Sequence, residues 1–175
     1  MIFKVNCGTG MQICKPANEP KQLMARLTHF CPPCLRYLAI LVEHAGCKSL
    51  HLKCGNLYGI EPELLDYKTM RVLAGSYHLR PEIVESTYYL YHYTHDPEYR
   101  KMGEILFNNF VRYCRADTGY AALADVTTKQ KKDEMESFVL AETFKYFYLL
   151  FASPKTLDFD KVVFNTEAHP LRRQW

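Results

Sequence analysis

The stretch "LRPEIVES" combines Arg80, Glu82 and Glu85 around a proline. Proline is well tolerated in the first turn of a helix, because the N–H that it lacks would be unpaired there. Pro81 therefore predicts the start of a helix that runs to about residue 94. Glu82 and Glu85 are then three residues apart and share one helix face. Helix capping alone can explain these acids, since the helix dipole favours negative charge in the first turn.

Helix capping cannot explain Glu142, because this residue lies inside a predicted helix and not in its first turn. The segment "DEMESFVLAETFKYFYLLF", from about Asp133 to Phe151, is apolar nearly all round and predicts a buried helix that stops before Pro154. Phe138 and Glu142 are four residues apart and lie on one stripe of it. A carboxylate in such a helix is costly unless it is paired, hydrogen-bonded or bound to a metal.

These acids suggest a chemistry if the fold brings them together with one more, Glu167, near the C-terminus. Carboxylates hydrogen-bond sugar hydroxyls, an aromatic face such as that of Phe138 covers a sugar ring, and paired acids hydrolyse glycosidic bonds. Carboxylate oxygens also suit a hard cation such as calcium. The residue types therefore predict a sugar site, a calcium site, or both.

The elements that must position these residues are mostly helical. Asp96 and Pro97 predict the cap and first position of a second helix, which carries an apolar stripe as far as Tyr113. "RADTGYAALADVTT" predicts a loop with short extended pieces, and "DKVVFNTEAHPL" predicts a strand followed by a polar turn. Paired helices with short links and little strand favour an all-α architecture. We expect an irregular segment over residues 1–20 and one domain over residues 21–171.

Composition excludes several classes of protein. A net charge of +3 over 175 residues is too small and dispersed to predict a nucleic-acid partner. No apolar run is long enough for a membrane span, and the start of the chain lacks a signal-peptide pattern. Six of the seven cysteines lie in the first 54 residues, where "HFCPPC" leaves open a small zinc-binding module. An odd cysteine count leaves at least one thiol without an internal disulfide partner.

The amino-acid sequences and the order of four segments resemble the C-terminal part of the class I α-1,2-mannosidases, glycoside hydrolase family 47. These segments are "LRPEIVESTYYLYHYTHDPEYR", "YCRADTGYAALADVTT", "DEMESFVLAETFKYFYLLF" and "VFNTEAHPL". The resemblance is clear over residues 78–171. "GIEPELLDY" is similar to the family's Gly-x-x-Pro-Glu segment, which makes Glu63 a further site residue.

The resemblance implies an (αα)7 barrel whose short C-terminal β-hairpin acts as a plug. It also implies calcium-dependent, inverting removal of α-1,2-linked mannose from high-mannose N-glycans in the endoplasmic reticulum or Golgi lumen. Glu82 matches the general base, and Thr166 matches the residue that binds calcium through its hydroxyl and carbonyl oxygens. The positions that match sugar-binding or calcium-water-holding residues are Glu63, Arg80, Glu85, Phe138, Glu142 and Glu167. The family's disulfide would join Cys47 to Cys31 or Cys34.

The family's domain is about two to three times longer than this chain, as seven helix pairs require. Its general acid and a further catalytic aspartate lie in N-terminal helices that have no counterpart here. We therefore expect the C-terminal part of the enzyme, inactive by itself, with any membrane attachment through a segment absent from this chain. The alternatives are a non-catalytic mannose-binding or quality-control relative, an inert fragment, or the zinc module.

Overall fold

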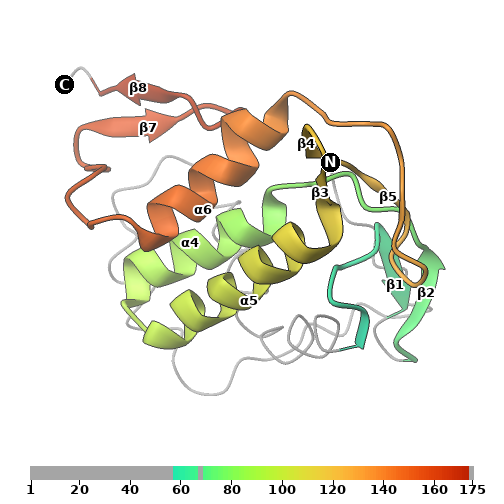
Figure 1. Cartoon of the computed structure of the whole chain (residues 1–175). Helices are drawn as coiled ribbons and strands as arrows, with labels where there is room; N and C mark the ends of the chain where they lie inside the picture. Colours follow the sequence, from blue (N-terminus) through green and yellow to red (C-terminus); the bar gives the residue numbers. More distant parts are fainter. Residues whose placement is uncertain (1–56, 67–68, 174–175) are drawn as a thin grey trace, which may run out of the picture.

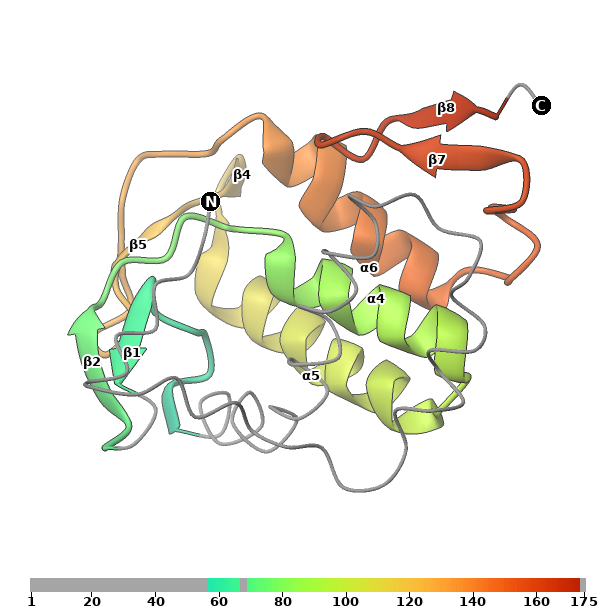
Figure 2. The same ribbon diagram turned by 180° about the vertical axis from the view of Figure 1, so that it is seen from behind.

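A computed structural model describes residues 57–66 and 69–173. This part of the chain contains three α-helices: α4 (Glu82–Thr94), α5 (Pro97–Cys114) and α6 (Phe144–Phe151). A π-helical turn, η1 (Val139–Thr143), leads directly into α6. Figure 1 and the reverse view in Figure 2 show α4 lying between α5 and α6, with α4 and α6 running in the same direction. This arrangement brings the first residues of α4 close to η1.

Local signals in the sequence set the bounds of α4 and α5 as predicted. Pro81 directly precedes α4. Asp96 caps α5, where its side chain accepts a hydrogen bond of 2.9 Å from the backbone N–H of Glu98. Pro97 fills the first position of α5, where its missing N–H costs nothing. Both predicted helices are confirmed.

The third helix begins later than predicted, at residues 138–139 rather than near Asp133. Residues 132–134 are instead held by backbone hydrogen bonds to Ala122. Lys132 N donates to Ala122 O at 2.8 Å, and Ala122 N donates to Glu134 O at 2.9 Å. Asp133 and Glu134, which predicted a helix start, therefore belong to a loop, because hydrogen bonding with a distant segment outweighs local helix propensity. The predicted end of the helix is confirmed, since α6 stops at Phe151, before Pro154.

Within residues 57–66 and 69–173, eight short strands form four antiparallel hairpins. Their pairs are β1 (Leu64–Asp66) with β2 (Arg71–Ala74), β3 (Arg115–Ala116) with β4 (Gly119–Tyr120), β5 (Leu123–Asp125) with β6 (Gln130–Lys131), and β7 (Val162–Phe164) with β8 (Pro170–Arg172). The C-terminal hairpin and the extended pieces after α5 were predicted. The hairpin β1–β2 was not, so the all-α prediction describes the helical centre and understates the strands.

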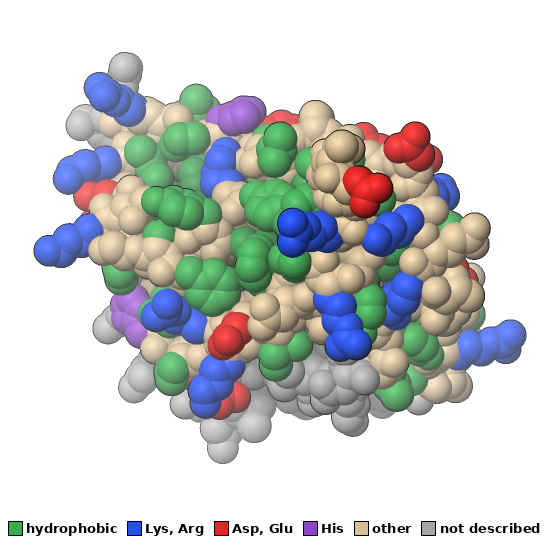
Figure 3. All heavy atoms as spheres, viewed as in Figure 1, with side chains coloured by type: hydrophobic (Ala, Val, Ile, Leu, Met, Phe, Trp, Pro, Cys, Tyr) green, Lys and Arg blue, Asp and Glu red, His purple; other side chains and the backbone are tan. Residues whose placement is uncertain are grey.

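The core lies where the three helices meet, and it includes the fully buried Phe110, Tyr146 and Leu150. Gly103 of α5 permits the close approach of α6, because a β-carbon at this position would lie 2.0 Å from Leu150 Cδ2. On the face in Figure 3, hydrophobic side chains gather over the helices among lysines and arginines. Among the described residues, no helix is both long and apolar enough to cross a membrane.

Candidate functional site

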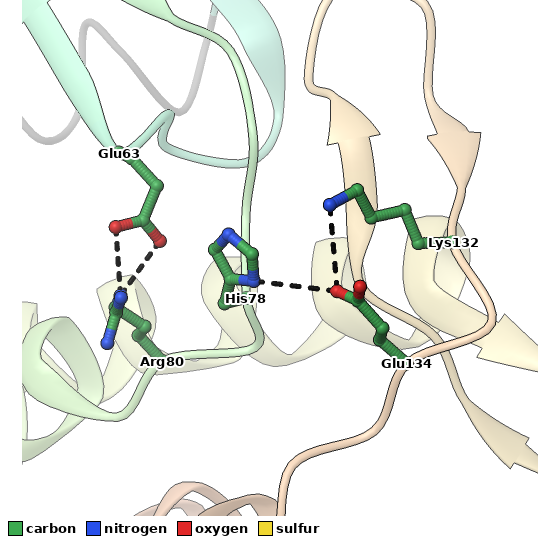
Figure 4. A network of polar contacts seen from close by, with 5 residues as sticks. All are labelled: Glu63, His78, Arg80, Lys132 and Glu134. Atoms are coloured by element: carbon green, nitrogen blue, oxygen red, sulfur yellow. Dashed lines mark hydrogen bonds and ion pairs between the residues drawn. The ribbon is translucent and has the colours of Figure 1, made fainter.

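Arg80 and Glu63 form an ion pair next to the start of α4. Arg80 Nε lies 2.8 Å from Glu63 Oε1 and 2.9 Å from Glu63 Oε2, and both side chains are mostly buried. Hydrogen bonding to Glu63 raises the pKa of Arg80, to which the nearby Glu63, Glu82 and Glu136 carboxylates also contribute, while burial opposes the shift. The guanidinium is therefore fixed beside the first residue of α4 (Figure 4).

Figure 4 also shows a second set of polar contacts beside this pair. Glu134 Oε2 lies 3.8 Å from His78 Nδ1 and 3.7 Å from Lys132 Nζ. These side chains are between a quarter and a half exposed, so the contacts contribute little to stability. They join the loop before η1 to the segment that carries Arg80.

The turn into α4 is strained and is held by η1. Leu79 has a φ of +60°, a conformation that is unusual for a bulky residue, although its side chain is fully buried. Its carbonyl oxygen accepts a hydrogen bond of 2.8 Å from Thr143 Oγ1, which is also buried. Because this bond joins Leu79 to the residue after Glu142, it fixes the spacing between the "RPE" turn and η1.

Glu142 lies in η1 and is only 8% exposed, so the prediction of a buried carboxyl is confirmed. Its pKa is raised to about 7, chiefly by burial and then by the charges of the Glu167, Glu85 and Glu82 carboxylates. A hydrogen bond with Glu167 also contributes. Glu142 thus interacts with three other acids, which come from α4 and from the segment after β7. We call Glu82, Glu85, Glu142 and Glu167 the acid cluster.

Glu167 reaches this cluster from the turn between β7 and β8. Asn165 Oδ1 fixes that turn by accepting hydrogen bonds from Glu167 N at 3.0 Å and His169 N at 2.9 Å. Lys145 Nζ donates a bond of 2.6 Å to Ala168 O and so joins the turn to α6. Thr166 is exposed in the same turn, beside Glu167. The predicted metal ligand and one of the predicted sugar-binding acids therefore share one anchored turn.

Two carboxyl groups at the start of α4 differ in their hydrogen bonding. Glu82 Oε2 is buried and accepts no hydrogen bond from the described residues. Glu85 Oε1 accepts a bond of 2.8 Å from the Tyr146 hydroxyl. Phe138, the remaining predicted site residue, is half-buried just before η1, where it packs against the core. An orphaned buried oxygen on Glu82 is costly by itself and is typical of a group that binds water or substrate.

Glu61 is a buried acid that sequence analysis missed. Its Oε1 atom is inaccessible to solvent and has no hydrogen-bond partner among the described residues. Burial raises the pKa of this carboxyl to about 7. The sequence has no spacing that marks it, and its neighbours Ile60 and Pro62 are buried in the structure. It also lies near Tyr77, whose pKa is raised mainly by burial and partly by the charges of Cys114, Glu61 and Glu82.

The described residues contain no group of three or more His, Cys, Asp or Glu side chains arranged to hold a metal ion. The cysteines of the zinc hypothesis and of the predicted disulfide all lie outside the described residues. Cys114 is a buried free thiol whose pKa burial raises to about 12. The acid cluster offers only oxygen atoms, so any ion held there would be one that prefers oxygen ligands.

Comparison with protein families matches residues 19–173 to glycosyl hydrolase family 47. Human ER degradation-enhancing alpha-mannosidase-like protein 3 is 48% identical over 103 residues, which are 58% of this chain and 11% of that protein. Human mannosyl-oligosaccharide 1,2-alpha-mannosidase IB is 47% identical over 97 residues, 54% of this chain and 15% of that protein. The chain therefore spans less than a fifth of these two relatives.

A similar solved structure is that of an alpha-1,2-mannosidase from Trichoderma reesei. The two structures align with a TM-score of 0.57 and 35% sequence identity. The alignment covers 66% of this chain and 30% of the Trichoderma protein. The described helices and hairpins thus resemble a part of that enzyme.

Proposed function

Because the chain belongs to glycosyl hydrolase family 47, we propose that it supplies part of the active site of a calcium-dependent, inverting α-1,2-mannosidase. The substrate would be terminal mannose on high-mannose N-glycans. The observation that carries this proposal is the acid cluster, in which carboxylates from α4 and the β7–β8 turn raise the pKa of the buried Glu142 carboxyl in η1. Such a concentration of carboxyl groups suits the recognition of hydroxyls and the acid–base chemistry of glycoside hydrolysis.

Glu82 is our candidate general base. Its buried Oε2 has no hydrogen-bond donor among the described residues, so it has an acceptor site for a water molecule. In an inverting mechanism the base removes a proton from the water that attacks the anomeric carbon. The Arg80–Glu63 pair and the Thr143–Leu79 bond hold the turn before Glu82 in place.

The other predicted site residues would hold the sugar. With a pKa of about 7, the Glu142 carboxyl carries a proton for much of the time near neutral pH, so it can donate as well as accept a hydrogen bond. Glu85 and Glu167 add acceptors, and Arg80 adds donors beside them. Phe138 would present its ring to the apolar face of the mannose. Glu63 would act through Arg80, which it already binds at 2.8 Å.

The residues present fit calcium better than zinc. The Glu142 carboxyl is destabilised as an anion by three neighbouring carboxylates, which is the imbalance that a divalent cation would offset. Thr166 would contribute its hydroxyl and carbonyl oxygens, and the acid cluster would contribute through water molecules. Calcium bound there would hold two hydroxyls of the terminal mannose.

Further parts of the proposal come from the family resemblance. We infer that the described helices belong to an (αα)7 barrel within a domain that starts near residue 21, and that the β7–β8 hairpin enters that barrel. The general acid would come from outside residues 57–173. The working compartment would be the lumen of the endoplasmic reticulum or Golgi, with N-glycosylated proteins as partners.

A chimera tests this proposal directly. Residues 57–173 would replace the aligned segment of the Trichoderma reesei α-1,2-mannosidase, and mannose release from an α-1,2-linked oligomannose would be measured. We expect an active chimera, whereas the 175-residue chain alone releases no mannose. Glu82→Gln should lower kcat by roughly 100-fold or more while substrate still binds, because the amide cannot accept a proton. Glu104→Gln, at an exposed position of α5, serves as the matched control.

The metal is tested in the same chimera. A chelator should abolish activity, and calcium but not zinc should restore it, because the site offers only oxygen ligands. Near-normal kcat in the Glu82→Gln chimera would contradict the base assignment. If the chain alone binds α-1,2-mannobiose but the chimera hydrolyses nothing, a non-catalytic mannose-binding role is the better description.

A further inference from the structure

Tyr146 makes a contact that the proposed mechanism does not use. This residue of α6 is only 1% exposed, and its hydroxyl donates a hydrogen bond of 2.8 Å to Glu85 Oε1 on α4. A hydrogen bond to a carboxylate is stronger than one between neutral groups, and burial strengthens it further. The bond therefore joins the core between α4 and α6 to one member of the acid cluster.

Tyr89 stands behind Tyr146 in the same network. Their hydroxyl groups hydrogen-bond to each other, and their ring centroids are 6.1 Å apart. Burial, with help from the Glu85 charge, raises the pKa of both tyrosines well above the ordinary value, so both hydroxyls keep their protons. Tyr89, Tyr146 and Glu85 thus form one hydrogen-bonded group.

Aromatic packing leaves the Tyr146 ring little freedom. It contacts Tyr88 of α4 and Phe164 of β7, with centroid separations of 6.0 Å in each case. A buried ring held on several sides keeps its hydroxyl at a defined point. We propose that Tyr146 is a positioning residue, whose hydroxyl sets the orientation of the Glu85 carboxylate for mannose binding. This inference rests on the proposed function, since it assigns Glu85 a sugar to bind.

The first test needs no sugar. The 175-residue chain would be labelled with carbon-13 at the glutamate carboxyl, and the Glu85 signal would be identified by its loss in Glu85→Gln. Tyr146→Phe, which deletes only the hydroxyl, should shift the Glu85 signal. Tyr88→Phe is the matched control, because Tyr88 is 5% exposed and packs in the same aromatic cluster. An unchanged Glu85 signal in Tyr146→Phe, or an equal shift in Tyr88→Phe, would overturn the inference.

The second test measures the binding of α-1,2-mannobiose to the same variants by titration. Tyr146→Phe should weaken binding roughly tenfold, as expected for the loss of one hydrogen bond to a charged group, and Tyr88→Phe should change it less than twofold. In the Glu85→Gln background, Tyr146→Phe should have little further effect, because both changes act on the same group. Additive effects would mean that Tyr146 acts through general packing, and the inference would be wrong. If neither the unmodified chain nor the chimera binds α-1,2-mannobiose, the proposed function fails, while the carboxyl signal still decides whether Tyr146 orients Glu85.

Discussion

Glu61→Gln should make the protein more stable at pH 8 while leaving its stability at pH 5 nearly unchanged. The Glu61 carboxyl is buried, and Oε1 has no hydrogen-bond partner in the described part of the chain. Burial raises its pKa from 4.5 to about 7, so the folded protein holds this group in its neutral form at pH 5. Glutamine resembles that neutral form in shape and charge, but it cannot ionise at higher pH.

The sign and size of the effect follow from proton linkage. Between pH 4.5 and 7 the folded state binds more protons at Glu61 than the unfolded state, so the free energy of unfolding falls as pH rises. The difference between 4.5 and about 7, at roughly 1.4 kcal/mol for each pH unit, amounts to about 3 kcal/mol. Above pH 7 the loss is complete and the dependence levels off.

Urea unfolding of both proteins at pH 5 and pH 8, with a chelator present, measures this difference. The Glu142 carboxyl also has a raised pKa, but it is present in both proteins and cancels in the comparison. Glu104→Gln, at an exposed position on α5, should leave the pH dependence as it is in the unmodified chain. If Glu61→Gln reduced the loss of stability between pH 5 and pH 8 by less than about 1 kcal/mol, the carboxyl would be better solvated or paired than its surroundings indicate.

Three further changes test other contacts. Thr143→Val keeps the volume but leaves the Leu79 carbonyl without its donor, so it should lower the free energy of unfolding by about 1–3 kcal/mol; an unchanged urea midpoint would show that the bond is dispensable. Gly103→Ala places a methyl group 2.0 Å from Leu150 Cδ2 and should destabilise the protein by about 1–3 kcal/mol, which an unaltered Tm would contradict. Thr166→Val removes one ligand oxygen and should weaken calcium binding in the chimera; an identical calcium titration would place the metal elsewhere.

Helix starts and ends were predictable where one or two residues decide them. Pro81 and the Asp96–Pro97 pair set the N-termini of α4 and α5, because their effects depend only on the backbone within one turn. Pro154 likewise limited α6. The β-branched tail was enough to predict β7, since the alternative of a helix there is poor.

Features set by distant contacts were not predictable from local pattern. Residues 133–137 have the composition of a helix start, but backbone hydrogen bonds with Ala122 keep the start of this segment out of a helix. The hydrogen bond from Thr143 stabilises a left-handed conformation at Leu79 that its own sequence does not favour. Each of these depends on residues ten or more positions away, which no local propensity contains.

The acid cluster was predictable in its members but not in its geometry. Glu142 was identifiable because burying a carboxyl in an apolar helix is costly unless the group has a partner. In the structure this residue is 8% exposed and lies among other acids. That Glu82 and Glu167 would meet it followed from the family resemblance, because their sequence separation alone allows many arrangements. Glu61 and the hydroxyl of Tyr146 escaped notice, since single buried polar atoms have no spacing to mark them.

The π-helical turn has a consequence for how this site can change. In η1 the backbone N–H of Phe144 reaches back five residues to Val139 O, so the turn holds one residue more than an α-helix would. Leu140 is 68% exposed there, and its deletion would let an α-helix close in its place. Residues before the deletion would then rotate by about 100° relative to α6, while Glu142 would stay in register with that helix. Deletion or insertion of one residue in η1 would thus change the direction of the Phe138 side chain without moving Glu142. The position of the aromatic ring could therefore change while the acid cluster stays in place.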